Sequence, residues 1–260
     1  MPKFAANLSF LFAELPFLDR FAAAASLGFK AVEFISPYDY PPEEIATHLQ
    51  RHSLELALFN APYSKSPGGE RGMAALPDRR DEFVFTFDRA LLYAEVTGCQ
   101  RIHVLSGVWP EGRDRREGEA CYIDNLRWCS DKAARLGVTL QVEPLNGRDA
   151  PGYFIGTTEQ GMDIVRRVGR ENVRLQLDLY HRQMTEGDLS EAVTSLVGWY
   201  SHIQIANVPG RHEPDDGEVN YSHLFQLIDE VGYQGWIGCE YRPRTTVIAG
   251  IGWAKPWGIG

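Results

Sequence analysis

Short runs of apolar, β-branched and aromatic residues recur along the chain and alternate with helix-length segments. The runs predict eight strands, at 4–9, 31–35, 54–60, 101–106, 138–144, 173–180, 202–208 and 236–241. Helical segments are predicted at 17–27, from the Pro41-Pro42 pair onwards, and at 80–97, 158–168 and 221–231. Strands that alternate with helices are joined by crossover connections, so the pattern predicts a parallel sheet.

The links between these segments favour a closed barrel over an open sheet. Glycine precedes a short polar link to the next strand at Gly28, Gly98, Gly137, Gly169 and Gly232. An open dinucleotide-binding sheet would place G-x-G-x-x-G after its first strand, whereas here FLFAELPFL follows. Eight strands in 260 residues suit a (β/α)₈ TIM barrel, which typically takes about 250 residues. We therefore predict one α/β barrel domain over 1–260.

Charge and composition exclude several classes of protein. The chain has 26 Lys and Arg against 35 Asp and Glu, a formal net charge of −9. Without a basic run, this acidity argues against nucleic acid and anionic membranes as partners. No apolar run reaches the ~18 residues of a membrane span, and MPKFAANLSF lacks a signal-peptide pattern. Four scattered cysteines without a C-x-x-C pair indicate a reducing compartment, so we expect a cytoplasmic protein.

Polar residues interrupt the apolar runs at the ends of four consecutive predicted strands. Glu143, Asp178, Gln204 and Glu240 come from the fifth to the eighth strand. Alternation along each strand directs them into the barrel, at the carboxyl ends where TIM barrels place their active sites. Carboxylates crowded in this way repel one another unless a cation neutralises them. Oxygen ligands suit Mg²⁺ or Mn²⁺, so we predict a divalent-metal site formed by these four residues.

Other polar residues near the predicted strand ends are candidates to contact a substrate. His181 follows Asp178 by three residues and is expected at the barrel mouth, where it can bond a substrate oxygen. Asn7 and His103 are either substrate contacts or structural hydrogen-bonding residues. Arg148 and Arg211 lie in the loops after the fifth and seventh strands, where a guanidinium can bind the carboxylate of an anionic substrate.

Two segments keep alternative interpretations. The long Gly- and Pro-containing loop 61–79 is either a lid over the active face or an inert insertion. The tail with Trp253 and Trp257 packs either on the barrel or on another subunit, which leaves a homo-oligomer open.

Longer motifs resemble the hydroxypyruvate isomerase family of xylose isomerase-like barrels. They are EPLNGRDAPGYF (143–154), QLDLYH (176–181), HIQIANVPGRHEPDDGEVNY (202–221) and GYQGWIGCEYRPR (232–244), with FAANLSFLF, AVEF and ALFNAP near the N-terminus. The resemblance implies a TIM barrel with a divalent metal on Glu143, Asp178, Gln204 and Glu240. It also implies that Glu143 and Glu240 are the proton donor and acceptor. The epimerase relatives have histidine where this chain has Gln204.

The resemblance implies an isomerase that converts hydroxypyruvate to tartronate semialdehyde through a metal-stabilised enediolate. A sister enzyme, 2-oxo-tetronate isomerase, shares RHEPDDGE and GYQGWIGCEY, and the tail AGIGWAKPW also favours it, whereas EPLNGRDAPG favours hydroxypyruvate. A ketose 3-epimerase is a further alternative, although a neutral substrate would not need the arginines. A metal-dependent endonuclease acting at apurinic sites would need a basic face, which the net charge of −9 opposes. A non-catalytic sugar-acid binding protein would not need two opposed carboxylates.

Overall fold

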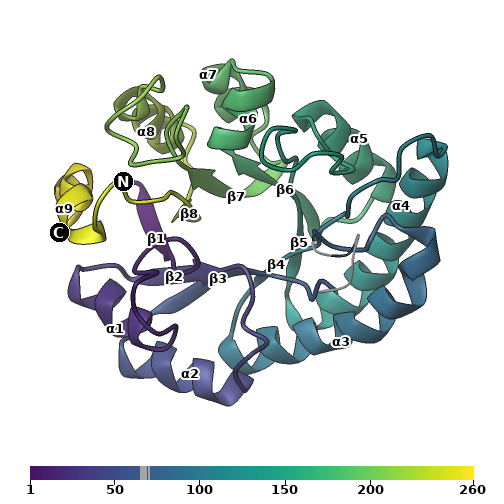
Figure 1. Cartoon of the computed structure of the whole chain (residues 1–260), viewed down its shortest axis with the longest axis horizontal. Coiled ribbons are helices and arrows are strands. Elements are labelled where there is room, and N and C mark those ends of the chain that lie inside the picture. The colour runs from purple at the N-terminus through teal and green to yellow at the C-terminus, as the bar shows by residue number, and fades with distance from the viewer. Residues whose placement is uncertain (65–68, 70) are drawn as a thin grey trace.

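Eight parallel strands close into a barrel in the computed structural model, which describes residues 1–64, 69 and 71–260. Each strand pairs with the next in sequence, and the eighth pairs with the first. Figure 1 shows the strands as a central ring with helices around it. The strands are β1 (Lys3–Asn7), β2 (Ala31–Phe34), β3 (Glu55–Asn60), β4 (Arg101–His103), β5 (Thr139–Val142), β6 (Val173–Asp178), β7 (Tyr200–Ile205) and β8 (Trp236–Cys239). The predicted TIM barrel is confirmed.

The connections between successive strands contain the helices of the outer ring. The α-helices are α1 (Asp19–Ser26), α2 (Pro42–Arg51), α3 (Arg80–Thr97), α4 (Arg115–Ala133), α5 (Thr158–Val168), α6 (Leu179–Thr185), α7 (Leu189–Ser195), α8 (Tyr221–Glu230) and α9 (Val247–Gly250). Short 3₁₀ turns are η1 (Pro77–Arg79), η2 (Ala134–Leu136) and η3 (Ile251–Trp257). Within the described part of the chain, no helix combines the length and apolar character needed to cross a bilayer.

The sixth strand is shorter than its sequence pattern predicts, because a helix begins inside the predicted range 173–180. Asp178 is the last residue of β6, and its side chain caps α6. Its Oδ1 accepts hydrogen bonds from the backbone N–H groups of Tyr180 at 2.7 Å and His181 at 3.3 Å. These bonds satisfy donors that the first turn of a helix leaves free. The apolar Leu179-Tyr180 pair, which prolongs the strand pattern, is therefore the first turn of α6.

Apolar side chains fill the space between the strands and the surrounding helices. On β6 and β7, Leu177 and Ile203 belong to this outer core, whereas the alternate residues Gln176 and Gln204 are buried on the other face. Ala5, Ala31 and Ala57 form a separate small cluster against Trp236. Strand alternation thus places polar groups inside the barrel, as the sequence predicts.

The C-terminal tail packs on the barrel of its own chain. Trp253 and Trp257 lie 5.1 and 5.3 Å, between ring centroids, from Phe4 of β1. Both indoles also contact Phe225 of α8. The tail therefore closes the seam where the first and last elements of the barrel meet.

Candidate functional site

A cavity of about 460 Å³ opens at the carboxyl ends of the strands. Five predicted site residues line it: His103, Glu143, His181, Arg211 and Glu240. They come from the ends of β4, β5 and β8, from α6 and from the loop after β7. This is the end of a TIM barrel at which active sites form.

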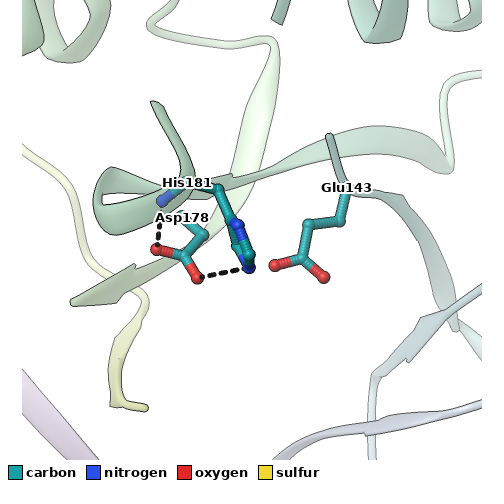
Figure 2. Close-up of side chains that lie close together, drawn as sticks. All are labelled: Glu143, Asp178 and His181. Atoms are coloured by element: carbon teal, nitrogen blue, oxygen red, sulfur yellow. Dashed lines mark hydrogen bonds and ion pairs between the residues drawn. The ribbon is translucent and has the colours of Figure 1, made fainter. Parts of the chain in front are cut away.

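Three buried carboxylates lie at this end of the barrel, and two of them, Glu143 and Glu240, line the cavity. Glu143 directly follows β5, Asp178 ends β6 and Glu240 directly follows β8; they are 5%, 4% and 9% exposed. Oxygens of Glu143 and Asp178 and a ring nitrogen of His181 lie within 4.8 Å of one another. Figure 2 shows the imidazole of His181 between the two carboxylates. Such a group of donor atoms is close enough to share one bound cation.

Burial of Glu143 and Glu240 disfavours their ionised forms. Burial, followed by the charges of Glu240 and Asp178, raises the pKa of Glu143 well above its usual value. Burial also raises the pKa of Glu240 to about 8, although the Arg211 guanidinium acts in the opposite direction. Groups whose pKa is shifted by burial and by specific neighbours cluster at functional sites. These carboxyl groups can therefore hold a proton near neutral pH.

The donor set fits a divalent cation. Oε1 of Glu143 and Oδ2 of Asp178 are buried and accept no hydrogen bond from the described residues. Buried carboxylate oxygens normally have hydrogen-bond partners or a metal. Carboxylate oxygens are preferred ligands of Mg²⁺ and Mn²⁺. Glu143 and Asp178 therefore suit a divalent cation, whereas Glu240 and Gln204, the other two predicted ligands, are outside this group of donor atoms.

Arg211 is the cation that the protein itself supplies to this cluster. Its Nη2 lies 2.7 Å from Oε2 of Glu240 and 3.6 Å from Oδ2 of Asp178, and its Nη1 lies 3.6 Å from Asp149. The guanidinium also lies 4.9 Å from the ring of Phe10. Three carboxylates share this one positive charge, so Arg211 is already largely compensated.

His181 presents a hydrogen-bond donor to the cavity. Its Nδ1 accepts the backbone N–H of Asn146 at 3.1 Å and lies 2.7 Å from the side-chain nitrogen of the same residue. Nδ1 is therefore unprotonated in the neutral ring, and the proton lies on Nε2, which is 3.6 Å from Asp178 Oδ2. Burial lowers the pKa of His181 to about 4, which keeps the ring neutral.

His103 supports Glu143 from the neighbouring strand. Its Nδ1 lies 3.2 Å from Oε2 of Glu143. Burial, followed by the charges of His181 and His202, lowers the pKa of His103 to about 3, so the ring is neutral. A neutral imidazole that donates from Nδ1 leaves Nε2 as an acceptor, and this atom is buried without a partner among the described residues.

Gln204 and Asn7 do not line the cavity but belong to a buried network around Glu33. Oε1 of Glu33 accepts from Asn7 Nδ2 at 2.9 Å and from Gln204 Nε2 at 2.8 Å. Oε2 of Glu33 lies 2.6 Å from His202 Nε2. The carbonyl oxygen of Gln204 accepts from Gln176 at 2.5 Å. Asp178, beside Gln204 in the sheet register, does not line the cavity either.

Of the two predicted arginines, Arg211 lines the cavity and Arg148 does not. Arg148 is exposed and is not part of the wall. Arg71 and Arg242 are part of it and escaped the sequence interpretation. Arg242 follows Glu240 by two residues, so its proximity to a strand end was a usable signal. Arg71 comes from the loop 61–79, where no periodic pattern indicates which side chain faces the site.

The loop 61–79, for which a lid and an inert insertion are the alternatives, falls partly outside the described residues, because 65–68 and 70 are not described. The described end of this loop is held against the β4–α4 connection: Gly72 forms an isolated bridge with Ser106, and Met73 and Ala74 are buried.

Comparison with known proteins identifies the family. The model of the xylose isomerase-like TIM barrel family matches residues 21–257. The chain is 50% identical to the 2-oxo-tetronate isomerase of Cupriavidus necator over 99% of both chains, and 40% identical to the hydroxypyruvate isomerase of Escherichia coli over 99% of this chain and 100% of that one. The chain belongs to the xylose isomerase-like TIM barrel family and, within it, to the isomerases related to these two enzymes.

Solved structures agree on the fold. A Brucella melitensis protein named AP endonuclease, family 2, superposes with a TM-score of 0.96 at 49% identity and 99% coverage of both chains. A D-psicose 3-epimerase from Clostridium cellulolyticum superposes with a TM-score of 0.79 at 20% identity, over 93% of this chain and 85% of that one. The second likeness concerns the barrel alone.

Proposed function

We propose that this isomerase moves the carbonyl group of a small 2-oxo acid to the adjacent, hydroxyl-bearing carbon, with Glu143 and Glu240 transferring the protons. The observation that carries the proposal is their arrangement: two buried carboxyl groups with raised pKa values line one cavity from β5 and β8. The two strands are three positions apart in a ring of eight, so they approach a bound molecule from different sides. General acid–base catalysis needs such groups near their working pH.

Each proposed catalytic carboxyl group has one fixed neighbour. His103 contacts Glu143 and Arg211 contacts Glu240, which limits the orientations of both side chains. A carboxylate that accepts a proton from carbon can keep it in this buried site until the adjacent carbon receives one. The Nε2–H of His181 is available to bond a substrate oxygen and hold it in place.

A divalent metal is part of the proposal. Glu143 and Asp178, which have oxygens within 4.8 Å of each other, would hold it, and Glu240 and Gln204 are the further ligands that the resemblance implies. The side-chain carbonyl oxygen of Gln204, which now accepts from Gln176, would turn to the metal. When bound, such a cation stabilises negative charge that develops on substrate oxygens. The proton on His181 Nε2 favours this residue as a substrate contact over a metal ligand.

The sequence identities support 2-oxo-tetronate as the substrate. Three enzymes named 2-oxo-tetronate isomerase are 50%, 45% and 44% identical to this chain, against 40% for the Escherichia coli hydroxypyruvate isomerase. Hydroxypyruvate, the substrate expected from the sequence motifs, remains the second candidate. Both compounds carry a carboxylate, a 2-oxo group and a hydroxyl on the third carbon, so one set of catalytic groups serves both.

An endonuclease function, which the name of the Brucella melitensis protein suggests, has less support. DNA binding relies on Lys and Arg that neutralise phosphates, whereas this chain has a net charge of −9. Among the described residues, a single group of three or more acidic or histidine donors is close enough for a metal ion.

A substrate panel tests the proposal. The purified protein is stripped with a chelator and assayed with 2-oxo-tetronate, hydroxypyruvate, a neutral ketohexose and an oligonucleotide with an apurinic site, each with and without Mg²⁺ or Mn²⁺. We expect metal-dependent turnover of the acids, with a higher kcat/KM for 2-oxo-tetronate. Turnover of the ketohexose alone, or cleavage of the oligonucleotide alone, would overturn the proposal.

A further inference from the structure

A carboxylate substrate needs a cation that the protein has not already neutralised. Arg211, the predicted carboxylate contact at the cavity, is paired with Glu240 and lies near two further carboxylates. Drawing it towards a substrate would remove the cation that balances Glu240 and Asp178. Arg148, the second predicted contact, is not in the cavity wall. The group that recognises the acid must therefore be sought among the other cationic residues of the wall.

Arg71 has the required position and charge. Its side chain lines the same cavity as Glu143, His181 and Glu240. Nη2 of Arg71 donates to the backbone carbonyl of Asp149 at 2.7 Å, a neutral acceptor that anchors the guanidinium without compensating its charge. No carboxylate of the described residues forms an ion pair with it. Its other N–H groups form no hydrogen bond with the described residues, so they can make a planar, two-point bond to a carboxylate.

The position of Arg71 is set by the glycine that follows it. Gly72 has φ 95°, a conformation that favours glycine, and a Cβ at this position would collide with Leu105. The bridge between Gly72 and Ser106 ties this part of the loop to the connection after β4. The backbone next to Arg71 is therefore fixed, although the guanidinium itself is exposed.

Arg71 is also linked to the carboxylate cluster through a single residue. Asp149, which accepts from Arg71 through its backbone carbonyl, also contacts Arg211 through its carboxylate. A substrate held between His181 and Arg71 would thus have one oxygen near the donor Nε2–H and its carboxylate at the guanidinium.

We propose that Arg71 binds the substrate carboxylate and gives this site its specificity for 2-oxo acids over neutral ketoses. The inference rests on the proposed function, because it assigns the carboxylate of that substrate. Arg242 is the other arginine in the wall outside the carboxylate cluster. It lies 5.9 Å from the ring of Phe10 and has no anchoring side-chain bond among the described residues, so it is the less fixed of the two.

Steady-state kinetics of three variants test the assignment. Arg71→Met removes the charge and keeps much of the side-chain volume, Arg71→Lys keeps a charge without the two-point geometry, and Arg51→Met removes an exposed arginine on α2 as a matched control. For Arg71→Met we expect a roughly 10- to 100-fold loss of kcat/KM with the acid, the range that charge-assisted hydrogen bonds contribute. The loss should lie mainly in KM, and Arg71→Lys should recover part of it.

A neutral competitor separates recognition of the carboxylate from a structural effect. Dihydroxyacetone has a hydroxymethyl group where hydroxypyruvate has its carboxylate, and its inhibition constant should stay within twofold of the wild-type value in Arg71→Met. A loss confined to kcat, or an equal loss of affinity for dihydroxyacetone, would overturn the assignment. So would an Arg71→Met enzyme with the kinetics of Arg51→Met, and in that case the proposed function would stand. If the wild-type enzyme turns over no 2-oxo acid, the proposed function fails and this inference fails with it.

Discussion

The side-chain amide of Gln204 donates a hydrogen bond to Oε1 of Glu33 over 2.8 Å, inside the barrel and out of contact with solvent. This bond determines which end of the Gln204 amide faces Glu33, so the carbonyl oxygen is directed the other way, to Gln176. Asn7 and His202 hold the same Glu33 carboxyl group. The network therefore fixes Gln204, which is predicted to bind the metal, through groups on β1, β2 and β7.

The first prediction concerns the stability that this network provides. Glu33→Ala leaves buried donors of Asn7, Gln204 and His202 without their acceptor, at about 1–3 kcal/mol each. We expect the free energy of unfolding to fall by about 3 kcal/mol or more in urea denaturation. Glu14→Ala, at an exposed position, is the control and should change it by less than about 0.5 kcal/mol. Equal effects of both substitutions would contradict a stabilising role of the network.

A second substitution disturbs the same network without replacing any of its polar residues. A Cβ added at Gly238 would meet the carboxyl group of Glu33, because β8 passes close to that side chain. Gly238→Ala should displace Glu33, lower stability and weaken Mn²⁺ binding through Gln204. Gly147→Ala, where an added Cβ meets nothing within 4 Å, is the control. Unchanged stability and unchanged Mn²⁺ affinity, measured by calorimetry, would show that Glu33 does not position Gln204.

Removal of a proposed catalytic proton carrier gives the third prediction. Glu240→Gln keeps the size of the side chain and a contact to Arg211, but an amide cannot accept and return the proton that moves between the substrate carbons. We expect kcat to fall by roughly 10²–10⁴-fold, the usual contribution of general acid–base catalysis. Circular dichroism should show an unchanged fold. An enzyme that retains near wild-type kcat after this substitution would refute the assigned role.

Protons and the metal should compete for the same carboxylates. The pKa of Glu240 is about 8 in the metal-free protein, because the group is buried, and that of Glu143 is also raised. Mn²⁺ binding at pH 7 should therefore release protons, and its affinity should rise from pH 6 to pH 8. Calorimetry in two buffers with different ionisation enthalpies measures the release. In Glu240→Gln the release should be smaller; equal values in both proteins would contradict the competition.

The raised pKa of Glu240 also predicts the pH dependence of stability without metal. Unfolding restores the ordinary pKa of about 4.5, so between about pH 4.5 and 8 the unfolded chain has lost a proton that the folded protein keeps. The contribution to stability is full below pH 4.5 and is lost as the pH rises to about 8. The Tm of the wild type should therefore decrease relative to that of Glu240→Gln across this window. A constant difference between the two Tm values would contradict the shift.

Residues at strand ends were predictable because barrel geometry places them. Glu143, Asp178 and Glu240 interrupt apolar runs, and parallel strands bring such positions to one end of the barrel. Tertiary partners were not predictable: nothing near Gln204 in the sequence indicates that Glu33, on the second strand, accepts from its amide. The orientation of Arg71 was not predictable either, because its loop has no periodic pattern that indicates side-chain direction. Nor does the sequence indicate that carboxylates from three separate segments balance the charge of Arg211.

The last prediction concerns the proton on His181. Nδ1 of His181 accepts a hydrogen bond from the backbone N–H of Asn146, a donor that no side-chain substitution removes. The neutral ring should therefore carry its proton on Nε2 at pH values above about 4. Nitrogen-15 NMR of the metal-free protein distinguishes the two tautomers by their ring shifts. We expect the Nε2–H form for His181 between pH 6 and 8, with Asn146→Ala leaving it unchanged because the backbone bond remains. His181→Gln provides the assignment of the signal. A protonated Nδ1 would mean that Nε2 is free to bind metal, and His181 would then move from the substrate contacts to the metal ligands.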